Sequence, residues 1–233
     1  MNWLEISLQP TTLFSLKPSW ATSSGGKSLL SPTPYALKMA LLDVAIRTGG
    51  LEAGKNAWPW LRDLQVSIRL PNQIVVTNVF SRILRKRRGK SARGPFQKTI
   101  GYREYVHYPE PLTLTLGIED VGNQNTLARW LPQINYLGKR GGFVQPLGSP
   151  VSRDNDDGFL RLTEEPTEID PRGIVQQLDD CGHRMTFEHA DIYSGKRVAS
   201  GSSTGRIVRH IVLPFRLSKS SKSYTMYERI GEL

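Results

Sequence analysis

The sequence predicts an α+β fold in which two helices cover one face of a sheet, compatible with the ferredoxin-like or split βαβ layout. Two observations predict it. Segments with alternating apolar residues and segments with helical spacing follow one another as strand, helix, strand and strand, then, after a basic stretch, strand and helix. The basic stretch leaves one strand and returns as another, which predicts an inserted extended β-hairpin with a basic tip.

The first strand and the first helix follow from local patterns. Trp3, Ile6 and Leu8 predict a strand that ends at Pro10. A loop rich in Ser, Thr and Gly covers 11–30, and a helix is predicted from Tyr35 to Arg47, with an apolar stripe at Leu37, Leu41, Val44 and Ala45. Ser31 or Thr33 can cap this helix, and Gly49-Gly50 ends it.

The remaining elements of the frame follow in order. The sequence predicts a short helix over 56–62, strands over 64–70, 74–80, 99–106 and 112–118, and a helix over 123–133 that is capped near Asn123 and closed by Pro132. Further on, a strand is expected at 142–145, turns over 151–177, and a terminal hairpin formed by 203–216 and 218–229. We therefore expect one domain over 1–150, which holds the two helices and the basic hairpin, and a smaller part over 151–233 that is acidic at first and then rich in β-strands.

Composition excludes several classes of protein. One cysteine in 233 residues, Cys181, excludes an intramolecular disulfide framework and a cysteine-rich zinc site and suggests a reducing compartment. No run of about 18 apolar residues is present, so no transmembrane helix is expected, and the first ten residues do not resemble a signal peptide. A net charge of +10 indicates a polyanionic partner, with nucleic acid favoured over an anionic membrane surface.

The charge is concentrated in two segments. Nine basic residues and no acids lie between Ser81 and Arg103, namely Arg82, Arg85, Lys86, Arg87, Arg88, Lys90, Arg93, Lys98 and Arg103. The segment 151–191 holds eleven acids against four arginines, a net charge of −7 that leaves +17 for the rest of the chain. The acidic segment can be a solvated face or a surface for a basic protein neighbour, whereas the basic segment predicts a polyanion-binding finger.

Two candidate RNA-binding elements follow. The loop Gly138-Lys139-Arg140-Gly141-Gly142-Phe143 combines backbone freedom for close approach to an anion with two cations and an aromatic ring. The returning strand interleaves Tyr102 and Tyr105 with Arg103, so arginine can neutralise phosphates while tyrosine rings stack on unpaired bases. The simpler alternatives are a connecting turn and tyrosines that pack a sheet.

Catalysis remains an alternative interpretation. A metal-independent ribonuclease needs a base, an acid and a cation, which His107, Tyr102 or Tyr105, and Lys98 could supply if they converge. His183 and His189 have weak spacing for a metal, so no metal site and no cofactor are expected. Gly26-Lys27-Ser28 lacks the first glycine of a phosphate loop, because Ala21 stands in its place, and nucleotide hydrolysis is rejected.

Three stretches resemble the fifth Cas family, the RAMP-superfamily subunits that bind the repeat handle in type I CRISPR surveillance complexes (Cascade). They are Asn78-Val79-Phe80-Ser81-Arg82-Ile83-Leu84-Arg85-Lys86, Gln97-Lys98-Thr99-Ile100-Gly101-Tyr102-Arg103-Glu104-Tyr105-Val106, and the glycine-rich segment 134–143. With the first strand and helix, the resemblance covers roughly the N-terminal two-thirds of the chain.

The resemblance implies a ferredoxin-like, RRM-like fold with a protruding thumb at about 81–100 and a β-rich C-terminal part. It implies a non-catalytic subunit in the prokaryotic cytoplasm that binds the 5′ handle of the CRISPR RNA (crRNA), contacts the backbone and large subunits, and reaches target DNA only through the complex. One branch of the family is itself a processing nuclease. The expected RNA-binding residues are Arg85, Lys86, Arg87, Arg88, Arg103, Tyr102, Tyr105, Gly138, Lys139, Arg140, Gly141, Gly142 and Phe143.

Two rival functions stay open at this point. An endoribonuclease would cut repeat RNA with the set His107, Tyr102 and Lys98. A basic structural protein of a ribosome-like particle would bind RNA with no preference for a handle. The CRISPR subtype, the handle sequence and the partner surfaces do not follow from the sequence.

Overall fold

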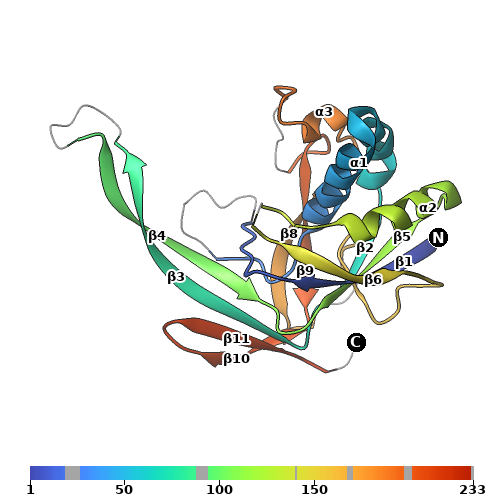
Figure 1. The fold of residues 1–233 in the computed structure, drawn as a ribbon. Coiled ribbons are helices and arrows are strands. Elements are labelled where there is room, and N and C mark those ends of the chain that lie inside the picture. Colours follow the sequence, from blue (N-terminus) through green and yellow to red (C-terminus); the bar gives the residue numbers. More distant parts are fainter. Residues whose placement is uncertain (19–26, 88–93, 140, 167–169, 197–200, 232–233) are drawn as a thin grey trace.

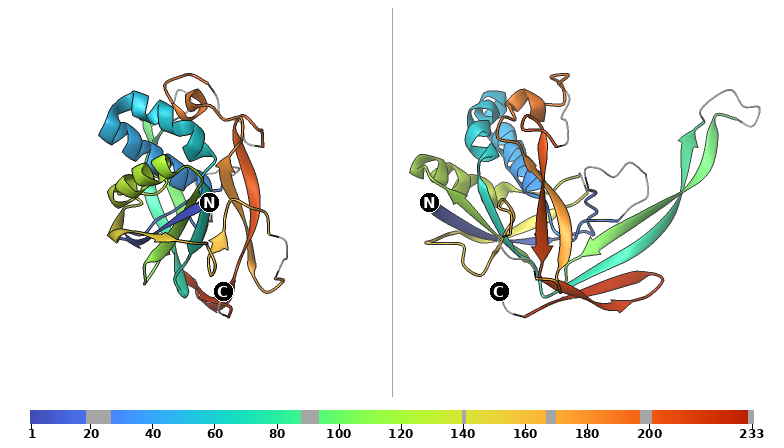
Figure 2. Two further views of the ribbon diagram at one scale, coloured as in Figure 1. Left: turned by 90° about the vertical axis from the view of Figure 1, so that its right-hand side faces the viewer. Right: turned by 180° about the vertical axis from the view of Figure 1, so that it is seen from behind.

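In a computed structural model, two sheets meet at a shared core, and a long hairpin projects from the body (Figures 1 and 2). The structure describes residues 1–18, 27–87, 94–139, 141–166, 170–196 and 201–231. The chain is mixed α and β, as predicted. Its described part is rich in strands and holds three α-helices, of 29, 10 and 4 residues.

The first sheet has the strand order β6-β1-β5-β2-β7. Its members are β1 (Asn2–Pro10), β2 (Gln65–Arg69), β5 (Leu112–Ile118), β6 (Val144–Arg153) and β7 (Leu160–Arg161), and all neighbouring strands run antiparallel. Ile6 faces Leu114, which faces Ile68, so apolar residues form rows across the buried face of the sheet. These rows explain the alternating pattern that predicted the strands.

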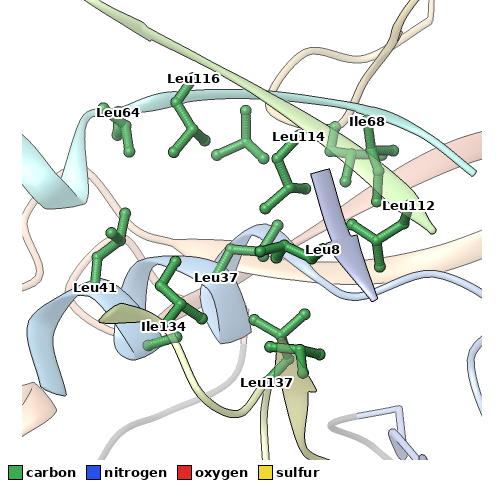
Figure 3. Packing of buried hydrophobic residues seen from close by; sticks show 14 of the residues in the cluster. Leu8, Leu37, Leu41, Leu64, Ile68, Leu112, Leu114, Leu116, Ile134 and Leu137 are labelled. Carbon is green, nitrogen blue, oxygen red and sulfur yellow. The ribbon is translucent and has the colours of Figure 1, made fainter. Parts of the chain in front are cut away.

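Two helices cover that face of the sheet. Helical segment α1 (Pro34–Arg62) packs Leu37 and Leu41 against the strands, close to Leu8 and Leu112 (Figure 3). The Thr33 hydroxyl accepts a hydrogen bond from the amide of Ala36 at 3.1 Å, which confirms one of the two expected caps. Helix α2 (Val121–Trp130) continues into a 3₁₀ turn, η1 (Leu131–Gln133).

The helices agree with the sequence prediction at Gly50 and differ from it in two bounds. Gly50 interrupts α1 with φ of +80° and ψ of 177°, so the first helix ends where Gly49-Gly50 was expected to end it. The second helix begins directly after Gly50, earlier than the range 56–62 that was expected. Helix α2 begins earlier than expected. Its cap is Asp120, whose carboxylate accepts a hydrogen bond from the amide of Asn123 at 3.1 Å.

The second sheet has the order β10-β11-β3-β4 and contains the predicted hairpin. Strands β3 (Gln73–Lys86) and β4 (Phe96–His107) pair in continuous antiparallel register from Val75–His107 to Lys86–Phe96. Strands β10 (Phe215–Ser220) and β11 (Tyr224–Arg229) pair with each other, and β11 joins the base of β3. The far half of the hairpin stands clear of the body (Figure 2).

The C-terminal part is where the sequence prediction was wrong about pairing. Strand β8 (Ile174–Cys181) was not expected and begins within the segment 151–177, which was expected to hold turns; it pairs with β9 (Arg206–Leu213) in a separate two-stranded sheet. The segment 203–216 therefore does not pair with 218–229, because β10 and β11 form their own hairpin. Helix α3 (Phe187–Ala190) lies between β8 and β9 in the chain, and β6 extends well beyond the four residues expected.

A buried ion network attaches β8 and β9 to α1. The Lys38 ammonium donates to Asp180 Oδ1 at 2.7 Å and to the carbonyl of Arg62 at 2.8 Å, and the Arg209 guanidinium donates to Asp180 Oδ2 at 3.0 Å. One apolar cluster also extends from the first sheet to Leu178, Ile211 and Phe215. Among the described residues, no helix is long and apolar enough to cross a membrane.

Candidate nucleic-acid interface

The hairpin has two chemically different faces. Residues that oppose each other in an antiparallel pair lie on the same face, and side chains alternate between faces along each strand. Phe80 opposes Tyr102, Arg82 opposes Ile100, and Leu84 opposes Lys98, so the even-numbered residues of both strands share one face. The odd-numbered residues share the other. The expected RNA-binding residues are therefore divided between the faces.

The even face carries exposed apolar side chains between cations. Phe80, Leu84 and Ile100 each expose 68% of their surface. The rings of Phe80 and Tyr102 lie 5.0 Å apart and are tilted by 47°. Lys86 and Lys98 are exposed on the same face, toward the tip. This face thus combines the cations and aromatic rings that were expected with aliphatic side chains that were not.

Tyr102 is held by hydrogen bonds near the body. Its hydroxyl donates to Asn78 Oδ1 at 2.8 Å and lies 3.3 Å from Glu104 Oε1. Partial burial and the Glu104 carboxylate raise the pKa of Tyr102 above its usual value. Glu104 Oε2 in turn accepts the amide of Ser28 at 2.8 Å, which ties β4 to the chain ahead of α1. Tyr102 is therefore positioned, with its ring beside Phe80.

The odd face carries Arg85, Arg103 and Tyr105. Tyr105 opposes Thr77 near the base of the hairpin and is half-buried. Arg87, next to the tip, donates from Nε to the carbonyl of Phe96 at 3.0 Å. Arg88 lies outside the described residues.

The expected lack of acidic partners holds for five cations of the hairpin that the structure describes. No carboxylate of the described residues forms an ion pair with Arg82, Arg85, Lys86, Lys98 or Arg103. Arg87 makes further contacts. The positive charge of the hairpin therefore faces solvent or a binding partner.

The glycine-rich loop is a tight turn fixed at both ends. Gly138 and Gly141 have φ of +74° and +104°, and a Cβ on Gly138 would overlap the side chain of Leu16. The Gly142 amide donates to the carbonyl of Lys139 at 3.0 Å, and the Phe143 amide donates to Thr12 Oγ1 at 3.2 Å. These two amides are engaged within the protein. An anion at this loop would meet side-chain charge first.

The glycine-rich loop and the hairpin bring their cations close to one another. Lys139 is exposed on the loop, and its pKa is lowered by partial burial and by the positive charges of Arg103 and Lys17. No carboxylate of the described chain lies within ion-pair distance of Lys139. Three cations from β4, the glycine-rich loop and the chain ahead of α1 thus lie within electrostatic reach of one another. We name Lys17, Arg103 and Lys139 the cation cluster.

Sequence reasoning missed Lys17 and Ser28. Both lie in the segment 11–30, which was expected to be a loop of no stated role. The Ser28 hydroxyl bonds the backbone of Leu16, and Phe14 forms a β-bridge with Val106 at the edge of β4. The described residues of this segment therefore contact both the glycine-rich loop, through Thr12, and the hairpin, through Phe14. Phe143, at the end of that loop, exposes about half of its surface, and Arg140 lies outside the described residues.

The residues considered for catalysis do not converge. His107 is on the odd face of β4, whereas Tyr102 and Lys98 are on the even face. His107 lies nine positions along β4 from Lys98, which is roughly 30 Å at 3.3 Å per residue. His189 Nδ1 accepts the amide of Thr186 within the α3 cap, and no group of His, Cys, Asp and Glu among the described residues could hold a metal ion.

The acidic segment is partly internal. Asp156, Asp179 and Asp180 are buried. Arg161 donates to both oxygens of Asp156 at 2.8 Å, and Arg206 lies 3.4 Å from Asp179. Three of the eleven acids at 151–191 are therefore buried and paired with cations of the same chain, while other acids of the segment remain at the surface.

Comparison with known proteins identifies a curated relative and a solved structure with a similar fold. No family model matches the sequence. A curated relative, the CRISPR-associated protein Cas5 of Archaeoglobus fulgidus, is 27% identical over 236 residues, covering 95% of this chain and 96% of the relative. The crystal structure of a CRISPR protein from Archaeoglobus fulgidus matches with a TM-score of 0.51 at 12% identity, over 99% of this chain and 93% of that one.

A chain of a CRISPR RNA-guided surveillance complex covers 99% of this chain and 91% of its own length at 12% identity, but its TM-score of 0.36 is too low to establish a shared fold. The solved Archaeoglobus protein supports the mixed α and β fold alone. The curated relative matches along nearly the whole sequence. The chain is therefore a homologue of Cas5, in agreement with the resemblance noted in its sequence.

Proposed function

We propose that this chain is a non-catalytic subunit of a Cascade-type CRISPR surveillance complex in the prokaryotic cytoplasm and that it binds the 5′ handle of the crRNA. The Cas5 relationship supports membership in such a complex. The observation that carries the handle-binding proposal is the cation cluster, because positive charges gathered from three parts of the chain favour a polyanion.

The frame of the molecule is consistent with an RNA-recognition domain. The central strands have the order β6-β1-β5-β2, α1 connects β1 to β2, and α2 connects β5 to β6. This is the arrangement of a split βαβ unit, and it supports the ferredoxin-like interpretation of residues 1–150. The hairpin β3–β4 is then the inserted thumb, and residues 151–233 are the smaller C-terminal part.

In this proposal the RNA crosses from the glycine-rich loop to the base of the hairpin. Lys139 and Arg103 neutralise phosphates, and the exposed rings of Phe143 and Phe80 offer stacking surfaces for unpaired bases. Tyr102 and Tyr105 are less available, since each is half-buried. The backbone and large subunits would contact surfaces farther out, and target DNA would be met through the assembled complex.

The test is handle-RNA binding by the assembled complex, before and after Arg103→Ala with Lys139→Ala. Loss of two phosphate contacts to a single strand should lower the slope of log affinity against log salt by about 1.4 and weaken binding roughly 14-fold near 0.15 M salt. The matched control is Arg216→Ala with Lys219→Ala, two exposed cations on the remote strand β10. Equal effects of both pairs would remove the cation cluster from the model.

Two further measurements address the rival functions. Incubation of the purified chain with repeat RNA in a chelator tests the endoribonuclease, which predicts specific cutting that His107→Ala abolishes. The separation of His107 from Tyr102 and Lys98 argues against it. Competition with scrambled RNA tests the ribosome-like alternative, since a subunit that reads a handle is displaced poorly by a scrambled strand.

A further inference from the structure

A groove of about 780 Å³ runs along α1, next to the glycine-rich loop. Its floor is the stripe from Tyr35 through Met39 and Asp43 to Ile46, which spans roughly 16 Å at 1.5 Å per residue. One wall is the chain around Lys17 and Tyr136–Lys139. The other wall is the segment from Phe187 to Tyr193, which consists of α3 and the three residues after it.

The groove is apolar along its outer half. Ile192 and Tyr193 expose 84% and 90% of their surfaces, the highest values among the large apolar side chains that the structure describes. Leu51 and Ile46, on α1 at the same end, are also exposed. Four exposed apolar side chains at the mouth of one groove are unusual for a surface that faces only water.

The two ends of the groove carry opposite charge. Lys17, Lys139 and Arg206 line the end near the start of α1, where the Arg206 guanidinium lies 4.1 Å from the ring of Tyr35. Arg206 is paired there with Asp179. At the other end the lining carboxylates are Asp43, which pairs with Arg47 at 3.2 Å, and Asp191.

From this arrangement we propose that the groove binds an amphipathic helix of a neighbouring protein subunit. A helix with an apolar stripe is favoured because its three turns match the length of the floor, and its i, i+4 and i+7 side chains can enter between Met39 and Ile192. The helix lies parallel to α1. Its N-terminal turn carries acidic residues toward Lys17 and Lys139, and its last turn carries basic residues toward Asp43 and Asp191.

An RNA strand is the less suitable occupant. Asp43 and Asp191 would face phosphates at the outer end, and Ile192, Leu51 and Ile46 offer no hydrogen bonds to bases. A protein helix buries these side chains and leaves Lys139 able to contact RNA from the other side. The groove therefore adds a protein contact next to the proposed RNA site. This inference rests on the proposed function only in that the chain works within a multi-subunit particle.

Photo-crosslinking in the purified assembled particle tests the proposal. A benzophenone amino acid replaces Ile192, and a second preparation carries it at Val121, a 63% exposed position at the start of α2 that does not line the groove. We expect the first position to cross-link to one helical segment of another protein subunit, identified by mass spectrometry, and the second not to reach that segment. Cross-links from Ile192 to RNA, to a second copy of this chain, or to no protein would overturn the proposal.

A synthetic peptide of the cross-linked segment then provides the quantitative test. Fluorescence anisotropy should show binding to the full chain that Ile192→Asp weakens at least tenfold and that Val121→Asp leaves unchanged. Equal affinities for the two variants, or no binding by the peptide, would contradict a helix-binding groove. The crRNA content of the same particles reports separately on the handle-binding proposal, because neither substitution touches the cation cluster.

Discussion

Replacement of Lys38 by methionine should destabilise the protein strongly, although methionine is close to lysine in length. Lys38 and Asp180 have side chains that are 2% exposed, and their charged groups lie 2.7 Å apart. Lys38→Met leaves the Asp180 carboxylate buried with two remaining partners, the Arg209 guanidinium at 3.0 Å and the Cys181 amide at 2.7 Å. It also removes the donor to the Arg62 carbonyl.

The size of the effect follows from these losses. Removal of one partner from a buried ion pair costs about 3–5 kcal/mol, because the other charge is left without compensation. Since Arg209 and the amide still neutralise part of the Asp180 charge, we expect the lower limit, about 3 kcal/mol. This is a large fraction of the roughly 5–15 kcal/mol by which a domain is stable.

Urea unfolding of the full chain, followed by tryptophan fluorescence, measures the change. With a slope near 3 kcal/mol per molar urea, the midpoint should fall by about 1 M. Lys55→Met is the matched control, because Lys55 makes an exposed pair with Glu52 at 2.8 Å and its loss should leave the midpoint unchanged. A shift for Lys38→Met no larger than that of the control would refute the view that this network attaches β8 and β9 to α1.

Three further predictions concern single residues. Gly138→Ala should lower the unfolding temperature and weaken handle RNA binding together, because φ is +74° and the added Cβ has no room; unchanged melting would contradict this. Burial raises the pKa of Asp156, but hydrogen bonds from Arg161 and Ser67 outweigh burial and lower it overall, so its stabilising contribution is present above about pH 4 and is lost as the pH falls through the lowered pKa. Urea midpoints measured against pH should therefore fall less steeply in acid for Asp156→Asn than for the wild type. Burial raises the pKa of the Cys181 thiol to about 12, so a thiol reagent at pH 8 should label Cys181 in urea and not in the native protein. Rapid labelling of the native protein would contradict this and show that β8 opens readily.

The elements that sequence patterns predicted well are those with strong local signals. The alternation of Leu112, Leu114 and Leu116 required a strand with one buried face, and β5 is central in its sheet. The start of the first helix was indicated by Pro34 and by two candidate caps, of which Thr33 is the one used. The basic hairpin was predictable because two alternating segments flank a run of cations.

The failures have physical causes. Strand β8 was missed because its buried residues include Asp179 and Asp180, one on each face, and these carboxylates are tolerated only because they form ion pairs with residues distant in the sequence. Pairing of β9 with β8, and not with the segment after it, is a choice between distant partners that local patterns do not encode. The division of the hairpin into two faces was available from the parity of residue numbers, and it separates His107 from Tyr102 and Lys98.

The pairing of β11 with β3 has a consequence for biosynthesis. Thr77 is matched with Tyr224, so the base of the projecting arm gains its neighbour only after nearly 150 further residues have left the ribosome. Until then β3 and β4 form a two-stranded ribbon, which is marginally stable alone, with apolar side chains open to other nascent chains. Such an arm is secured late, and rapid capture by its assembly partners would protect it from aggregation during that interval.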